Sequence, residues 1–173
     1  MKSIKINISK LTYTIDLPVL VLFIAVSLDI ISTTLFAGLG AGVEKNPILS
    51  RLVEVSIWFI PVYLLATDAI FIPFLSSILR KTFSIAFTLI SIFLAVNNFL
   101  LIVFGTAFLI DTIGFNAIVL LLILLGLATF AYFITKEKLG KKEILITCIK
   151  FILFILFIAS IHLLFWVVTR LVS

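Results

Sequence analysis

The sequence predicts an all-α fold, a polytopic transmembrane bundle of five helices, and two observations lead to it. Hydrophobic residues make up 64% of the 173-residue chain, whereas charged residues make up only 12%. A soluble domain carries about twice that share of charge, because its exterior must be wetted. The charged residues also fall between long apolar runs, which is the pattern of helices that cross a lipid bilayer.

The apolar runs and the turn signals between them define the expected helices of a single membrane domain. Asn46 is a suitable N-cap and Pro47 suits a first helical position, so a helix should begin there and enter the second span. Pro61 and Pro73 should bend that span. The five spans are expected over residues 17–39, 55–79, 83–110, 117–135 and 144–169.

The segment before the first span, residues 1–16, has a different pattern. Apolar and polar residues alternate in it with a period of two, as in Ile4, Ile6 and Ile8 against Lys5, Asn7 and Ser9. The segment is short and basic, and we expect a cytoplasmic arm that lies on the lipid headgroups. The apolar run after it is long for a signal peptide and contains Asp29, so it should stay in the chain as the first helix.

The basic residues predict the orientation of the chain. If the five spans alternate in direction, ten basic residues lie on one side of the membrane and three on the other. The ten are Lys2, Lys5, Lys10, Arg80, Lys81, Lys136, Lys138, Lys141, Lys142 and Lys150, and the three are Lys45, Arg51 and Arg170. Arg80 and Lys81 should form a tight turn between the second and third spans. Because basic loops stay in the cytoplasm, the N-terminus should lie inside and the C-terminus outside the cell membrane. The net charge of +5 then suits an anionic lipid surface, and we expect no nucleic-acid partner.

The residues with most chemical interest are polar groups far inside the spans. At about 1.5 Å per residue, the acids and amides of the first three spans lie at nearly the same depth. A carboxylate at the bilayer centre costs about 2.5–3.5 kcal/mol even on insertion scales, so it needs a reason. The predicted intramembrane polar cluster comprises Asp29, Ser32, Thr33, Asp68, Asn97 and Asn98.

Several explanations of this cluster are open. The two acids can be protonated, can share a bound cation with neighbouring oxygens, or can face a positive charge on a partner subunit. Neutral polar side chains can also act only as hydrogen-bonding contacts between helices. His162 is the only histidine, so no metal site or cofactor is expected, and its imidazole should pack in the bundle and bond to a backbone carbonyl.

The loop after the first span carries the second predicted site, Glu44, Asn46 and Pro47. Its simplest role is a capped helix start, and its functional role would be an outward contact surface. Together with the motif that begins at Asp29 and includes Thr33, this loop resembles a family of short, uncharacterised prokaryotic polytopic membrane proteins. That family shows Asp-x-x-x-Thr in its first helix and a Glu-x-Asn-Pro loop. The resemblance covers about 50 residues, implies a transmembrane fold and assigns no activity.

The sequence contains no recognisable catalytic constellation, and this guides the functional prediction. We expect a non-enzymatic accessory or structural subunit of a larger membrane complex, whose partners are the bilayer and other membrane subunits or copies of itself. The apolar faces of the last two spans would bury against such a partner. The alternative is a small carrier or channel coupled to protons or monovalent cations through the intramembrane acids. A membrane-embedded enzyme comes third, since Asp29 and Asp68 lack the Gly-x-Gly-Asp context of intramembrane aspartyl proteases.

Overall fold

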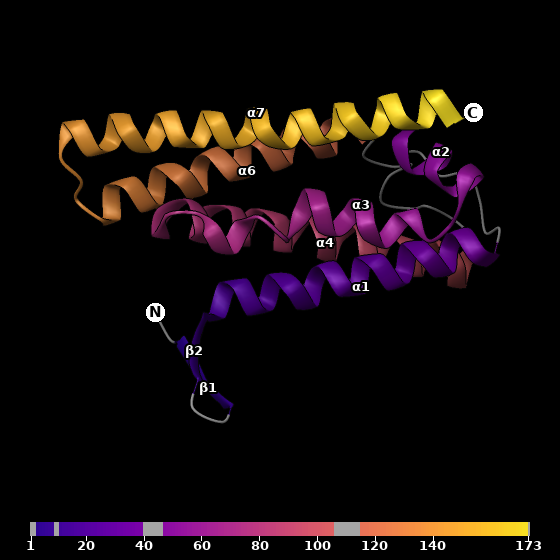
Figure 1. Cartoon of the computed structure of the whole chain (residues 1–173), viewed down its shortest axis with the longest axis horizontal. Coiled ribbons are helices and arrows are strands. Elements are labelled where there is room, and N and C mark those ends of the chain that lie inside the picture. The colour runs from indigo at the N-terminus through magenta and orange to yellow at the C-terminus, as the bar shows by residue number, and fades with distance from the viewer. Residues whose placement is uncertain (1–2, 9–10, 40–46, 106–114, 173) are drawn as a thin grey trace.

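The computed structural model shows a helical bundle with a β-hairpin at one end (Figure 1). It describes residues 3–8, 11–39, 47–105 and 115–172. The long helices run side by side, and the hairpin lies crosswise to them at the start of α1. The elements in chain order are β1 (Ser3–Ile8), β2 (Leu11–Asp16), α1 (Leu17–Leu39), α2 (Pro47–Val55), α3 (Phe59–Asp68), η1 (Ile72–Phe74), α4 (Ser77–Phe104), α6 (Phe115–Lys136) and α7 (Lys141–Val172).

The first helix begins and ends where the sequence predicts it. α1 covers Leu17–Leu39, and its buried residues recur every three or four positions, from Val19 to Phe36. This spacing places them on one stripe of a 3.6-residue helix. The stripe packs against α4, and this is the most extensive contact between two helices in the described residues.

The predicted arm is a β-hairpin, so the all-α prediction is correct for the bundle and incomplete for the N-terminus. β1 and β2 pair antiparallel, with Ser3 opposite Asp16 and Ile8 opposite Leu11. The alternation of polar and apolar residues is the pattern typical of a strand with two different faces. The period of two in the sequence therefore indicated strands, although it did not show that two of them would pair.

The prediction of one continuous second span over 55–79 is wrong. A helix does begin at Pro47, but α2 ends at Val55, α3 ends at Asp68, and a 3-10 turn follows in η1. Pro61 lies in the first turn of α3, where a missing N–H costs no helical hydrogen bond. Pro73 lies in η1, and in a continuous helix its ring would clash with the carbonyl of residue 69, so the chain breaks before it.

The prediction of a separate basic turn at Arg80 and Lys81 is also wrong. α4 begins at Ser77, earlier than the expected residue 83, and both basic residues lie in its first turns. Arginine and lysine are good helix formers, so a helix can begin ahead of them. At its other end α4 stops at Phe104, because Gly105 adopts a left-handed φ of 72°. Residues 106–110 of the expected span lie outside the described residues.

The last two helices are slightly longer than expected. α6 covers Phe115–Lys136 and α7 covers Lys141–Val172, against predictions of 117–135 and 144–169. Three helices within the described residues are long and apolar enough to cross a membrane, namely α1, α4 and Lys141–Leu171 of α7. The segments Phe59–Phe74 and Ile123–Lys136 are apolar but shorter. These helices are consistent with an integral membrane protein.

Two apolar clusters hold the bundle together. In the larger one, aromatic rings from three helices pack together. Phe83 of α4 lies 4.5 Å from Phe154 of α7 with its plane tilted by 56°, and Phe130 of α6 stacks on Phe151 of α7 at 4.2 Å, centroid to centroid. The smaller cluster joins α2 to α3 through Leu52, Ile60, Tyr63 and Leu64. Offset aromatic pairs add about 0.5–1.5 kcal/mol each beyond the area that they bury.

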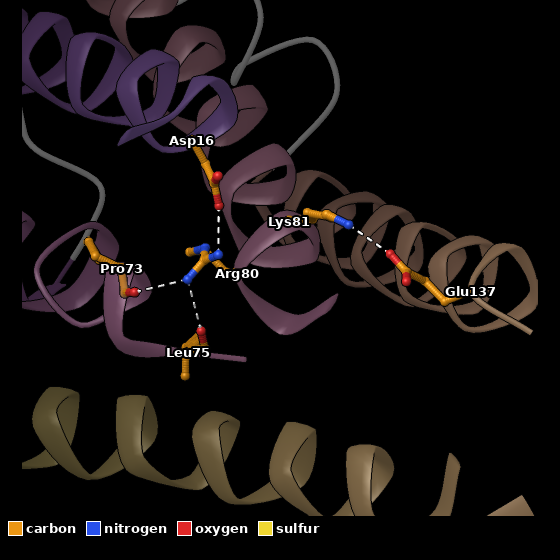
Figure 2. Close-up of polar contacts among 6 residues, drawn as sticks. All are labelled: Asp16, Pro73, Leu75, Arg80, Lys81 and Glu137. Atoms are coloured by element: carbon orange, nitrogen blue, oxygen red, sulfur yellow. Dashed lines mark hydrogen bonds and ion pairs between the residues drawn. The ribbon is translucent and has the colours of Figure 1, made fainter. Parts of the chain in front are cut away.

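Ion pairs join the elements at the end of the bundle where the hairpin lies (Figure 2). Arg80 of α4 binds Asp16, at the end of β2, with 2.7 Å between Nη2 and Oδ2. The Nη1 of Arg80 also donates to the carbonyls of Pro73 and Leu75, both at 3.4 Å. Lys81 Nζ lies 2.7 Å from Oε1 of Glu137, just beyond α6. Two neighbouring residues of α4 therefore connect the hairpin, η1 and the end of α6.

The Lys81–Glu137 pair predicts a dependence of stability on pH. The hydrogen bond and the charge of Lys81 lower the pKa of the Glu137 carboxyl from its ordinary value of 4.5. A carboxyl whose pKa is lowered on folding contributes stability that is complete above its unfolded pKa and is lost as the pH falls through its folded pKa. In detergent, the wild type should therefore unfold at a higher temperature than Glu137→Gln at neutral pH, and this difference should shrink below pH 4.5.

The exposed carboxyl of Glu54 on α2 provides the control for this measurement. Glu54→Gln should leave the acid dependence of the unfolding midpoint as in the wild type. A Glu137→Gln variant that keeps a constant difference from the wild type across the acid range would contradict the assignment.

Candidate functional site

Most of the predicted intramembrane polar cluster lies where α1 packs against α4. Asp29, Ser32 and Thr33 belong to the buried stripe of α1 and are 1%, 0% and 3% exposed. On α4, Asn97 is buried and Asn98 is half-buried. The sequence reasoning placed these residues at one depth, and the structure places several of them in direct contact.

A chain of hydrogen bonds connects the two helices. Asn98 Nδ2 donates to Thr33 Oγ1 at 2.9 Å and to Ser32 Oγ at 3.3 Å. The Thr33 hydroxyl donates to Asp29 Oδ1 at 3.2 Å, one helical turn back along α1. The Ser32 hydroxyl donates to the backbone carbonyl of Asp29 at 3.0 Å. Asn98, Thr33 and Asp29 thus form a continuous donor–acceptor chain that begins on α4 and ends at a carboxyl group of α1.

The chemistry of this chain is that of a contact between helices. An amide nitrogen faces both hydroxyl oxygens of α1, so each of these oxygens already accepts a hydrogen bond. A cation in this place would need the oxygens to face a common centre without an N–H between them. Within the described residues, no group of three or more histidine, cysteine, aspartate or glutamate side chains gathers around a common point.

The other predicted members of the cluster, Asp68 and Asn97, lie on α3 and α4. Asp68 is the last residue of α3, which packs against α1, and it is 9% exposed. Thr67, its neighbour, donates to the backbone carbonyl of Tyr63 at 3.0 Å. Asn97 points about 100° around α4 from Asn98. None of the four hydrogen bonds of the preceding chain includes Asp68 or Asn97.

A stripe of small residues on α4, most of them polar, was missed in the sequence. Ser84, Thr88, Ser91 and Ala95 are buried, and with Asn98 they recur at spacings of four, three, four and three. This spacing places them on the same face of α4 as Asn98, which contacts α1. Small side chains let two membrane helices approach closely. The repeat was visible in the sequence. However, small residues within an apolar helix do not show which face of it contacts another helix until the partner is known.

The predicted packing of His162 is confirmed. Its Nδ1 lies 2.9 Å from the backbone carbonyl of Ile158, one turn earlier in α7. A carbonyl can only accept, so Nδ1 carries the proton in this contact. The imidazole also makes an edge-to-face contact with Tyr63 of α3, at 5.6 Å between centroids, and Phe165 makes a similar contact at 5.1 Å. These rings join α3 to α7 as a packing unit.

The second predicted site falls mostly outside the described residues. Glu44 and Asn46 lie in the segment 40–46, whereas Pro47 is the first residue of α2. The proposed helix start is therefore seen, but its cap and the contact surface stay predictions. The chain matches no protein-family model, no curated protein and no solved structure.

The contribution of the hydrogen-bond chain to stability can be tested by a substitution at Thr33, with the next residue as the control. Thr33→Val keeps the shape of the side chain but leaves the Asn98 amide and the Asp29 carboxyl without their common partner. Intramembrane hydrogen bonds contribute about 0.6–1.7 kcal/mol, so we expect a loss of about 1 kcal/mol in free energy of unfolding. The measurement is reversible unfolding of the purified protein in mixed micelles.

Thr34→Val is the matched control, because the buried hydroxyl of Thr34 has no hydrogen-bond partner among the described residues. This variant should be as stable as the wild type or slightly more stable, since a buried polar group is removed. Equal effects of the two substitutions would show that the hydrogen bonds of Thr33 do not hold α1 and α4 together.

Proposed function

We propose that the protein is an integral membrane protein that acts as a non-enzymatic accessory subunit of a larger membrane complex. The observation that carries this proposal is the exposure of α7. Only 11% of the most apolar stretch of α7 is buried within the described part of the chain, against 44% for α1. A long helix that covers so little of its own bundle is available for contact with another membrane protein.

The face of α7 that points away from the bundle has features of a helix-packing surface. The buried side chains of α7 include Phe151, Phe154 and Thr169, whereas Ala159 and Ser160 are exposed among large apolar neighbours. The Ser160 hydroxyl is already bonded to the carbonyl of Leu156 at 2.8 Å, so it does not oppose burial. Small residues allow a second helix to approach, which favours a protein partner on this face.

The interior of the bundle supports a structural role for its polar groups. The Asn98–Thr33–Asp29 chain joins two helices of the same protein, and the hydroxyls of Ser32 and Thr67 bond to backbone carbonyls. Such contacts stabilise a bundle without any chemical step. The resemblance to a family of short prokaryotic membrane proteins remains a proposal beside this one and assigns no further role.

The distribution of charge supports the proposed topology in the cell membrane. The hairpin, the start of α4 and the turn between α6 and α7 lie at one end of the bundle, and α2 and the C-terminus lie at the other (Figure 1). The first end holds most of the basic residues, which favours the cytoplasm for it. Trp58, between α2 and α3, and Trp166, near the end of α7, are exposed in elements of the second end, as expected for an aromatic belt.

The accessory role predicts a specific loss of association. Extraction from native membranes in mild detergent should yield the protein with another membrane protein in fixed stoichiometry. Ala159→Phe should release that partner, because a large ring would hold the two helices apart, while the unfolding temperature should stay unchanged. Leu121→Phe, at an exposed position of α6, is the control and should keep the partner. A folded wild-type monomer without any partner would refute the proposal.

A second candidate, a carrier or channel for protons or monovalent cations, is favoured by one observation. Two carboxyl groups, those of Asp29 and Asp68, are buried in helices that pack against each other. This candidate predicts cation- or pH-driven flux in liposomes that hold the purified protein. Asp29→Asn or Asp68→Asn should abolish the flux, with Glu54→Gln as the surface control. Flux that is unchanged in both aspartate variants would exclude this function.

A further inference from the structure

The helical hydrogen bonding of the chain is interrupted after α3, inside the bundle. α3 ends at Asp68, and η1 begins only at Ile72. The N–H groups of Ala69 and Ile70 both bond to the carbonyl of Leu65, at 3.3 and 2.9 Å. Three backbone carbonyls at the end of α3 accept no hydrogen bond among the described residues, namely those of Ala66, Thr67 and Asp68.

A buried carboxyl group lies at the same break. The side chain of Asp68 is hydrogen-bonded to the hydroxyl of Thr67. This hydroxyl also donates to the carbonyl of Tyr63 at 3.0 Å, and it has only one proton to donate. In the described part of the chain, no lysine or arginine forms an ion pair with Asp68, and the last turn of α3 holds no basic residue. The carboxyl group therefore lacks a positive partner in the bundle.

Arg80 satisfies a different part of the break. Its guanidinium bonds to the carbonyls of Pro73 and Leu75, and its charge is paired with Asp16 (Figure 2). The carbonyls in and after η1 that face Arg80 thus have a donor. The acceptors without a donor belong to the end of α3.

The electrostatics of this break favour a cation. Helix carbonyls point along the axis toward the C-terminus and give that end a partial negative charge, so a carboxylate there is unfavourable and a cation is favourable. The break is also enclosed, because Ala69 and Ile72 are each 1% exposed and belong to the larger apolar cluster. Within a membrane, unwound carbonyls and the C-terminal ends of broken helices are ligands for small cations.

We propose that the break after α3 is a binding site for a monovalent cation. The carboxylate of Asp68 and the carbonyls of Ala66, Thr67 and Asp68 supply its oxygen ligands. One carboxylate balances one positive charge, whereas sites for divalent cations usually combine several carboxylates. The hydrogen-bond chain between α1 and α4 is a poorer site, because an amide N–H faces its oxygens. The inference deepens the second candidate function, on which it rests for transport but not for binding.

The stability of the full-length protein in detergent tests binding without transport. NaCl and KCl are each compared with choline chloride at equal ionic strength. In at least one of them the unfolding midpoint of the wild type should rise, by about 3–6 °C at a tenfold excess of the cation over its Kd. Asp68→Asn should lose this rise, because the charged ligand is gone. Glu54→Gln, at an exposed position of α2, is the control and should keep it.

The stability of Asp68→Asn in choline chloride shows whether this variant folds. Its unfolding midpoint there should equal or exceed that of the wild type, since the substitution removes a buried acid without a positive partner. A rise with Na⁺ or K⁺ that persists in a folded Asp68→Asn would overturn the proposal. A rise that is lost in Asp29→Asn and kept in Asp68→Asn would also overturn it, because the cation would then lie at α1.

Direct binding to the wild type keeps the proposal testable if Asp68→Asn does not fold. Equilibrium dialysis with radioactive Na⁺ or Rb⁺ should show saturable binding of a single ion per chain, which excess unlabelled salt displaces and choline does not. No saturable binding of either ion would overturn the proposal, since water would then satisfy the break. Binding in detergent without flux in liposomes would support this site and refute only the carrier function.

Discussion

The contact between α1 and α4 is the interaction on which the other elements depend. Its inner surface combines the buried stripe of α1 with the small residues of α4, and Asn98 crosses it to reach Thr33. α3 packs on the α1 side of this pair and α6 packs on the α4 side. In lipid there is little hydrophobic force between helices, so close packing and hydrogen bonds must define this contact. The polar residues that the sequence suggested as a chemical site therefore also help to define how α1 packs against α4.

The sequence predicted most helices because the apolar runs and the caps agreed with each other. The apolar run of α1 and the start at Pro47 follow from residue types whose local preference is the same in any context. The pairing of Asn98 with Thr33 was only suggested, because depth along a helix can be counted but rotation about it cannot. The orientation of each helix depends on its partner, and a single sequence does not name the partner.

The two wrong predictions between α3 and α4 share one physical origin, the way in which the chain resolves a local break in a helix. Proline indicates that a helix is disturbed, and Pro73 was expected to bend the helix. The chain instead stops α3 at Asp68 and forms η1, which moves the start of α4 back to Ser77. Whether proline bends or ends a helix depends on which donors bond to the backbone carbonyls that lose their helical N–H partners. Here the acceptor carbonyls of Pro73 and Leu75 face Arg80, which the sequence reasoning had assigned to a turn.

The contacts of Arg80 have a consequence for the order in which the segments of the chain can fold. A break between helices leaves backbone carbonyls without their N–H partners, and a buried carbonyl that stays without a partner is destabilising. The carbonyls of Pro73 and Leu75 precede Arg80 in the chain, so during synthesis they emerge from the ribosome before the guanidinium that satisfies them. The segment from α3 to η1 can therefore settle only once the first turns of α4 have been made. The packing of this segment is therefore tied to that of the following helix, and the two should reach their final arrangement together.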